Sequence, residues 1–142
     1  MTLNESTIYI KLKKLRKKLY HAQFLMDKSV RVVYGVRLLE KCAETIENFV
    51  MSFELKENKL HYAMLAIAKF AVLRTDIEFA KDENLIHYTK NKNISNDEHE
   101  KWVSSKQIEL FILVAEIDDE MNKWKENLAK RREIIIDKKD MR

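Results

Sequence analysis

The chain has 142 residues, of which 46% are hydrophobic and 35% charged, with a net charge of +4, one cysteine and one glycine. This length and apolar content predict one domain over residues 1–142. The single cysteine excludes an intrachain disulfide and a cysteine-rich zinc site, which indicates an intracellular protein. The longest apolar run, residues 110–115, is far shorter than the roughly 20 residues that cross a membrane, so we expect a cytoplasmic protein without a membrane span.

The first predicted helix covers residues 8–26. Its apolar residues recur at steps of four and three, which places them on one face of a helix. They are Ile8, Leu12, Leu15, Leu19, Ala22 and Met26. We expect this face to enter the core, while the lysines between its members face solvent.

This first quarter of the chain carries most of the positive charge. Residues 1–37 contain nine Lys or Arg and two Asp or Glu, a net charge of +7 (9 − 2), whereas the remaining residues have −3 (18 − 21). The asymmetry predicts an anionic partner for the first helix and the turn after it, most often a nucleic acid. The alternatives are an ordinary solvated lysine surface and a charged lipid surface.

A second helix is predicted to start near Asp27 or Ser29, either of which can cap it. The same spacing selects its buried face as Val32, Val36, Leu39, Ala43, Ile46, Val50 and Phe53. A single helix over residues 30–85 would far exceed the mean helix length of roughly 11 to 12 residues. We therefore expect a tight turn at residues 55–58.

The third helix is predicted from about residue 58 to residue 85. Its seam is Leu60, Ala63, Ile67, Phe70, Arg74 and Ile77. A buried guanidinium such as that of Arg74 needs acidic or carbonyl partners. The favoured interpretation is an internal ion pair, with a carboxylate such as Asp118 or Glu44, that fixes helix register. The alternative is an arginine that lines a pore or a partner groove.

Polar residues between 87 and 96 break the pattern and predict the longest loop. After it, Ser95 and Glu98 have the spacing of a capping box, in which each side chain binds the backbone amide of the other residue. The fourth helix follows, with a seam of Leu110, Val114, Ile117, Met121, Trp124 and Leu128. A charged tail of about residues 130–142 is expected to extend or fray beyond it.

Four amphipathic helices joined by short turns predict an all-α fold, an antiparallel up-down four-helix bundle, because each apolar face is buried only against the others. Extra apolar positions widen these faces, namely Val33, Cys42, Phe49, Leu73, Phe111 and Leu113. Faces this wide leave surface that another subunit could cover, so a homo-oligomer is expected.

Several catalytic and cofactor sites lack their sequence signatures. Di-iron bundles use a carboxylate three residues before a histidine, and none of the four histidines has one, so no metal is expected. A single glycine cannot form a phosphate-binding glycine loop or a dinucleotide fingerprint, and no nucleophile elbow is present. We therefore expect no cofactor and no catalytic residue.

One enzymatic alternative rests on Arg16 and His21, an arginine followed after four residues by a histidine. This pair is similar to the motif of HEPN ribonucleases. Those enzymes pair the motif across a helical dimer, where histidine acts as acid or base and arginine stabilises the phosphate transition state. Here Lys17 stands where the motif commonly has a polar residue, and the competing interpretation is a surface histidine beside lysines.

The segment over residues 26–38 carries a second resemblance, to a Phe-Pro-Lys-x-x-Arg-x-x-x-Gly pattern. The matching residues are Lys28, Arg31 and Gly35, followed by Arg37 and Leu38. This pattern is similar to the one that opens the second helix of Avd-like four-helix proteins, the accessory variability determinants of diversity-generating retroelements. These proteins are related to those encoded by ribosomal RNA intervening sequences. Met26 and Asp27 stand here in place of the phenylalanine and the proline.

The likeness spans most of residues 8–128, with a basic first helix, Leu73-Arg74 late in the third and Trp124 near the end of the fourth. It implies structural roles for Gly35, Arg74 and Trp124, with Gly35 permitting a close approach of helices. It also implies a pentamer, a five-fold barrel that binds a reverse transcriptase and its nucleic acid without catalysis of its own. The residues expected to contact RNA or DNA phosphates, or an acidic protein surface, are Lys13, Lys14, Lys17, Lys28, Arg31 and Arg37. Beside the ribonuclease, the other alternative is a bundle that only binds other proteins.

Overall fold

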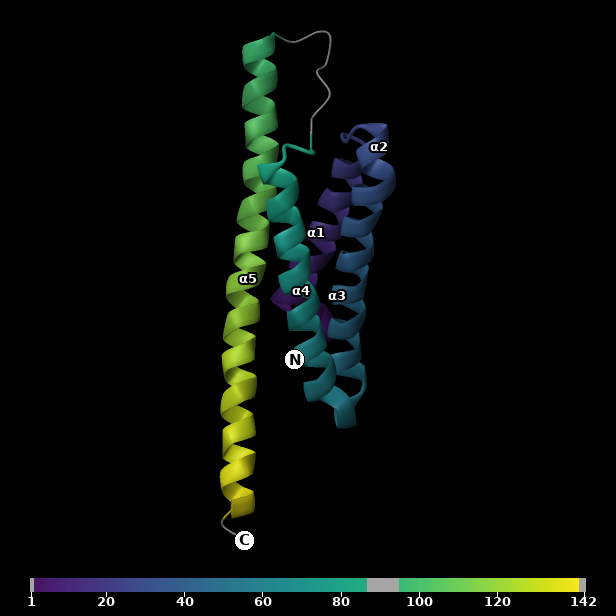
Figure 1. Cartoon of the computed structure of the whole chain (residues 1–142). Helices are drawn as coiled ribbons and strands as arrows, with labels where there is room; N and C mark the ends of the chain where they lie inside the picture. The colour runs from purple at the N-terminus through teal and green to yellow at the C-terminus, as the bar shows by residue number, and fades with distance from the viewer. Residues whose placement is uncertain (1, 87–94, 141–142) are drawn as a thin grey trace.

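Every regular element in the described residues is a helix (Figure 1). The computed structural model describes residues 2–86 and 95–140, with side chains as far as Arg131. The long helices are α1 (Thr7–Gln23), α3 (Val36–Glu54), α4 (Lys59–Asp82) and α5 (Asn96–Asp140). A short α2 (Lys28–Val30) and a π turn (Arg31–Gly35) lead into α3, and 3-10 turns occupy Leu3–Glu5 and Lys56–Asn58. The predicted all-α class with four long helices is confirmed.

The helix ends agree with the predicted turns. The tight turn expected at residues 55–58 is the 3-10 turn between α3 and α4. The capping box at the start of α5 is confirmed, because Glu98 N donates to Ser95 Oγ at 3.2 Å and Ser95 N donates to Glu98 Oε2 at 3.4 Å. α5 continues through the predicted tail to Asp140. Of the predicted loop, residues 87–94 lie outside the described part of the chain.

The long helices enclose one apolar core. α1 packs against α3 and α5, and α4 packs against the same two helices. α5 extends beyond the other helices at both of its ends (Figure 1). The most deeply buried core residues include Leu12, Leu15, Leu38, Phe49, Phe70, Leu73, Ile77, Ile117 and Met121. Across residues 2–86 and 95–140, no helix has an apolar stretch long enough to span a bilayer.

The apolar face predicted for the first helix is correct, and that of the third is nearly so. In α1, Leu12, Leu15, Leu19 and Ala22 are buried and Ile8 is half-buried, and Met26, just after the helix, is buried. In α4, Leu60 is 42% exposed, whereas Leu73, beside Arg74, is fully buried. The buried face of α4 is therefore turned slightly away from the predicted seam.

The apolar face predicted for the second helix is correct only in part, because the true face is centred about one position earlier. Ile46 is buried and Leu39, Val50 and Phe53 are half-buried against the core, whereas Val32 and Val36 are 64% and 43% exposed. Val33, one of the extra apolar positions, is 71% exposed. The buried face of α3 is Leu38, Cys42, Thr45, Ile46, Phe49 and Ser52. Thr45 and Ser52 are buried because their hydroxyls donate to carbonyls of their own helix, at 2.8 and 2.6 Å. Because two residues of this face carry hydroxyls, the spacing of apolar residues alone does not identify it.

The π turn is the second reason for this shift, because it inserts an extra residue and changes the phase of the positions around it. It also brings the start of α3 close to the end of α1. A Cβ atom on Gly35 would lie 3.1 Å from Gln23 Cβ and 3.4 Å from Met26 Sδ. The absent side chain therefore makes room for this close approach.

Arg74 forms an ion pair between α4 and α5. Its Nη1 donates to Asp118 Oδ1 at 2.6 Å, and its Nε lies 3.8 Å from Glu78 Oε1. Asp118 is one of the two partners proposed from the sequence, and the other, Glu44, pairs elsewhere. The side chain of Arg74 is 35% exposed, so the pair lies at the edge of the core rather than within it.

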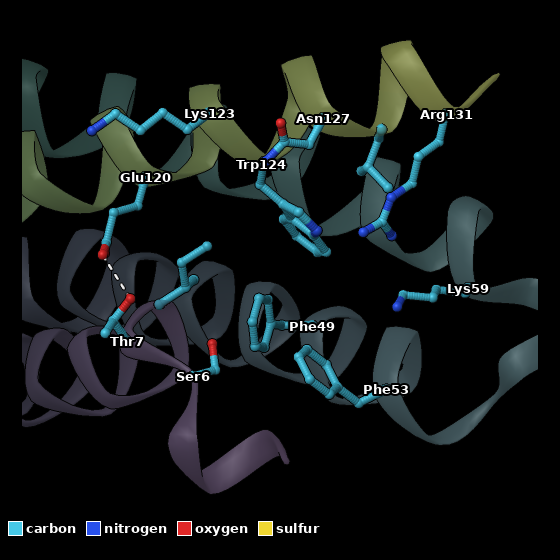
Figure 2. Close-up of a pocket in the computed structure, with 12 residues that line it drawn as sticks. Ser6, Thr7, Phe49, Phe53, Lys59, Glu120, Lys123, Trp124, Asn127 and Arg131 are labelled. Atoms are coloured by element: carbon cyan, nitrogen blue, oxygen red, sulfur yellow. Dashed lines mark hydrogen bonds between the residues drawn. The ribbon is translucent and has the colours of Figure 1, made fainter. Parts of the chain in front are cut away.

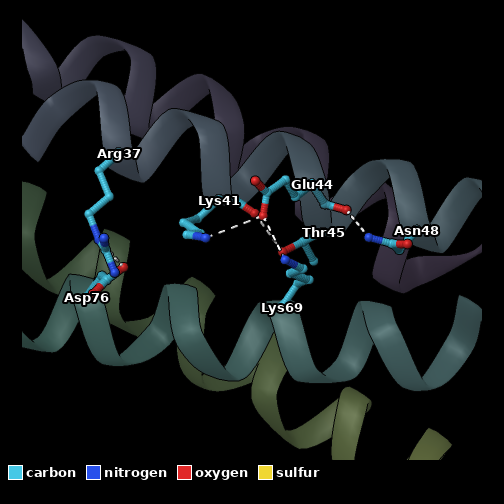
Figure 3. Close-up of polar contacts among 7 residues, drawn as sticks. All are labelled: Arg37, Lys41, Glu44, Thr45, Asn48, Lys69 and Asp76. Atoms are coloured by element: carbon cyan, nitrogen blue, oxygen red, sulfur yellow. Dashed lines mark hydrogen bonds and ion pairs between the residues drawn. The ribbon is translucent and has the colours of Figure 1, made fainter.

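Polar contacts also join α3 to α4 (Figure 3). Arg37 Nε lies 2.9 Å from Asp76 Oδ2, and Lys69 Nζ lies 3.2 Å from Glu44 Oε2. The bond from Lys69 holds the pKa of Glu44 below its ordinary value of 4.5. Tyr34 OH donates to the backbone oxygen of Asp76 at 2.5 Å, and burial raises the pKa of Tyr34 to about 12. These contacts fix the position of α4 on α3.

Candidate nucleic-acid interface

The lysines on the flank of α1 that faces α5 are paired with carboxylates. Lys11 Nζ lies 3.5 Å from Glu116 Oε2 and 3.4 Å from Glu120 Oε2. Lys18 Nζ lies 3.4 Å from Glu109 Oε2, and its hydrogen bond lowers the pKa of Glu109. These two lysines hold α1 against α5, so their charge is already compensated within the chain.

The other flank of α1, beside α3, has a shallow hollow of about 440 Å³. Its lining residues, which we call the basic groove, are Lys13, Arg16, Lys17, Tyr20 and Leu39. Three of these five are cationic and none is acidic. In the part of the chain that the structure describes, none of the three cations has a carboxylate at ion-pair distance. The basic groove therefore has positive charge available for an external anion.

Exposed aromatic rings continue the basic groove toward the end of α1. Tyr20 and Phe24 are 50% and 52% exposed, and their rings meet edge to face with centroids 5.2 Å apart. The guanidinium carbon of Arg31 lies 6.0 Å from the centroid of Phe24. Within the groove, Lys13 Nζ lies 4.6 Å from the ring centroid of Tyr9. Cations that neutralise phosphates and rings that stack on bases are the two components of single-stranded nucleic-acid sites.

The six predicted binding residues do not form one patch. Lys13 and Lys17 lie in the basic groove, and Arg31 adjoins it through Phe24. Lys14, one residue after Lys13, is turned by about 100° around the helix and leaves this surface. Lys28 is exposed at the start of α2.

Arg37 differs from the others because it is already engaged. Its hydrogen bond to Asp76 lies between α3 and α4, and this bond raises the pKa of Arg37. Half of its side chain remains exposed, at 50%. Arg37 therefore has a structural contact in addition to any contact with a partner.

The aromatic residues of this surface were not among the predicted binding residues. Tyr20 and Phe24 follow Lys13 and Lys17 at steps of three and four, so the four residues lie on one face of α1. The signal was therefore present in the spacing. Leu39 could not be found in this way, because it comes from α3 and joins the groove only through packing.

A second pocket of about 440 Å³ lies between the start of α1, the end of α3 and α5 (Figure 2). Trp124 projects from α5 toward Phe49, with ring centroids 5.1 Å apart. Lys59 and Arg131 turn toward the space beside Trp124. The acidic lining residue, Glu120, accepts a hydrogen bond from Thr7 at 2.7 Å. This pocket combines an aromatic surface with cations, but it is separate from the basic groove.

The two residues of the ribonuclease motif line different hollows. Arg16 lines the basic groove, whereas His21 lines a different hollow of about 280 Å³ between α1 and α5. Cys42 is buried, and burial raises its pKa to about 12, which keeps it a neutral thiol. Among the residues described, no group of three His, Cys, Asp or Glu side chains is placed to hold a metal ion.

Comparison of the chain with protein-family models, with curated proteins and with solved structures finds no match. The resemblance to Avd-like proteins therefore stays a prediction. We therefore infer function from the surface residues, above all from the basic groove, which includes Tyr20, and from the exposed ring of Phe24 next to it.

Proposed function

We propose that this protein is a non-catalytic nucleic-acid-binding adaptor, and that its basic groove holds a single-stranded RNA. The observation that carries this proposal is the contrast between the two flanks of α1. Lys11 and Lys18 are neutralised by carboxylates of α5, whereas Lys13, Arg16 and Lys17 have none at ion-pair distance in the described residues. Unpaired cations gathered in one hollow favour an anionic partner.

The exposed rings favour a single strand over a duplex. Base faces are covered by their neighbours in a duplex, and only an unpaired strand can place them on Tyr20 and Phe24. A phosphate backbone along Lys13 and Lys17 would bring successive bases to these rings, which follow the lysines on the same face of α1. Arg31, beside Phe24, would add a further phosphate contact.

The wider setting of this proposal comes from the resemblance to Avd-like proteins. We propose a cytoplasmic, single-domain, antiparallel up-down four-helix bundle that assembles with copies of itself, in a ring of five by that resemblance. Its partners would be a reverse transcriptase and the RNA or DNA that the enzyme handles. The short turn between α3 and α4, and the packing of α1 and α4 each against α3 and α5, support the bundle.

The test is equilibrium binding of a labelled single-stranded RNA by fluorescence anisotropy over a series of salt concentrations. Replacing Lys13, Lys14 and Lys17 together by glutamate should weaken binding strongly, while circular dichroism shows unchanged helicity. Each lost phosphate contact should also reduce the slope of log affinity against log salt by about 0.7. The same charge change at the exposed residues Lys56, Lys101 and Lys125 is the control, and it should leave most of the affinity intact.

Equal binding by the groove variant and the parent protein would overturn the proposal. So would cleavage of the RNA that stops when His21 is replaced by alanine, because that result would establish the ribonuclease alternative.

A further inference from the structure

The outer face of α4 is apolar although it lies at the surface. We call its residues the α4 seam, namely His61, Met64, Ala68, Ala71, Val72, Thr75, Phe79 and Asp82. All eight are exposed, and the larger apolar ones, Met64, Val72 and Phe79, are 44%, 43% and 50% exposed. Between His61 and Asp82 the seam contains no charged residue, because the exposed charges of this stretch, Glu78 and Lys81, lie at its edge toward α5, beside Arg74 and Phe111.

The opposite face of α4 already forms part of the core, through residues such as Ala66, Phe70 and Ile77. α4 is therefore apolar on both sides, and a helix of this kind is normally covered on both sides. Large exposed apolar surfaces on soluble proteins mark contacts with other molecules. The seam offers no lysine or arginine for phosphates, so a nucleic acid does not fit it.

The order of residues along the seam is symmetric about a point between Ala71 and Val72. Met64 and Phe79, the bulkiest pair, lie at equal distances on either side of this point. Ala68 and Thr75, both small, lie closer in, and His61 and Asp82 lie at the two ends. A two-fold contact needs such a self-complementary surface, because each residue of one chain meets the residue at the mirrored place in the other.

We infer that a second copy of this chain packs on the α4 seam, with the two α4 helices antiparallel and crossing at Ala71 and Val72. The small residues at the centre let the helix backbones approach, and each Phe79 packs beside the Met64 of the other chain. His61 of one chain then meets Asp82 of the other, so an imidazole N–H donor faces a carboxylate acceptor at each end of the contact. In a parallel pair, Asp82 would meet Asp82, and the bulky residues would also meet their own copies.

This contact is independent of nucleic-acid binding, because the basic groove lies on α1 and α3 and stays open. It is also independent of a ring of five, which uses two different surfaces of each chain. A two-fold contact through α4 would join two free chains or two whole rings. The number of chains in the assembly is then even.

Engineered cysteines test the contact directly. In the antiparallel pair, residue 71 lies about 1.5 Å along the axis from its own copy, whereas residue 68 lies about 10 Å from its copy. Disulfides need Cα atoms within about 7 Å of each other. Ala71→Cys should therefore form a covalent dimer under mild oxidation, and Ala68→Cys should not. The native Cys42 is buried and stays in place.

The control is Ala115→Cys, at an exposed position on α5, which should stay monomeric on denaturing gels. Linking of both Ala68→Cys and Ala71→Cys would indicate a parallel pair, and no faster linking of Ala71→Cys than of Ala115→Cys would show that the seam is free. Either result overturns the inference. Because no RNA is present, neither result bears on the basic groove.

Native mass by light scattering gives a second test. Val72→Arg places a charge at the crossing point and should halve the native mass without loss of helicity. Ile112→Arg is the matched control, since Ile112 is an apolar residue of α5 that is 54% exposed, and it should leave the mass unchanged. An unchanged mass for Val72→Arg, or an odd number of chains in the parent protein, would also contradict a two-fold contact.

Discussion

The two flanks of α1 carry the same residue type with opposite consequences. Toward α5, Lys11 and Lys18 meet Glu109, Glu116 and Glu120, which hold the helices together. Toward α3, the lysines of the basic groove lie beside Tyr20 and Leu39, and among the described residues no carboxylate is within ion-pair distance of them. Whether a lysine of α1 is free to contact a partner therefore depends on which helix lies beside it. The number of lysines along α1 does not show which of them are free.

The largest expected effect comes from reversing charge on the open flank alone. Lys13→Glu with Lys17→Glu should weaken binding of single-stranded RNA by about 100-fold, since a hydrogen bond to a charged group contributes about 1.5–3 kcal/mol and tenfold corresponds to about 1.4 kcal/mol. Lys14→Glu, which is turned off this surface, should cost far less. Anisotropy titrations at one salt concentration measure both variants.

A result in which Lys14→Glu weakens binding as much as the double variant would show that total charge matters and position does not. That outcome would remove the distinction between the flanks. Thermal unfolding of all three proteins is the accompanying control, and their midpoints should agree.

A smaller effect is expected from the rings. Tyr20→Ala should weaken binding by roughly tenfold, because stacking of one base contributes about 1–3 kcal/mol. Tyr20→Phe keeps the ring and should bind like the parent protein. Duplex RNA should be insensitive to both changes, and equal losses on duplex and single strand would contradict stacking.

The helices were predictable from the sequence because apolar spacing and capping residues are local signals. The stripe through Leu12, Leu15 and Leu19 was correct, since nothing interrupts its spacing. The face of α3 was predicted only in part, because Thr45 and Ser52 bury their hydroxyls against their own helix and the π turn changes which positions face the core. Neither the buried hydroxyls nor the π turn can be inferred from the spacing of apolar residues.

The candidate site was predictable only in part for a different reason. Lys13 and Lys17 were among the predicted residues, but so were Lys14, on another face, and Arg37, which binds Asp76. Separating them requires knowledge of which helix lies beside each residue. Asp118 could be named as a partner of Arg74 because a guanidinium on an apolar seam demands a carboxylate, whereas an exposed lysine makes no such demand.

The paired flank predicts a modest effect on stability. Lys18→Glu places a carboxylate beside Glu109 and should lower the midpoint of thermal unfolding by a few degrees. Adding Glu109→Lys restores an opposite pair and should recover most of the loss. Recovery of the unfolding midpoint in the double variant would show that the loss came from the broken ion pair and not from a change in net charge. RNA binding by the double variant should match that of the parent protein, since net charge is unchanged and the groove is untouched.

The smallest predicted effect concerns acid. Hydrogen bonds from Lys18 and Lys69 lower the pKa values of Glu109 and Glu44 from the ordinary 4.5, so these carboxylates bind protons less readily in the folded chain than in the unfolded one. Their contribution to the free energy of unfolding is therefore present above about pH 4.5 and lost as pH falls through the folded pKa values.

Urea unfolding between pH 7 and pH 3 should show this loss, and Glu109→Gln with Glu44→Gln should flatten the dependence of the free energy of unfolding on pH. Acid therefore acts on the paired flank, where it weakens the contact of Glu109 that holds α1 to α5, and also on the contact of Glu44 between α3 and α4. An identical pH dependence in the parent protein and the double glutamine variant would show that these pairs contribute nothing to folding.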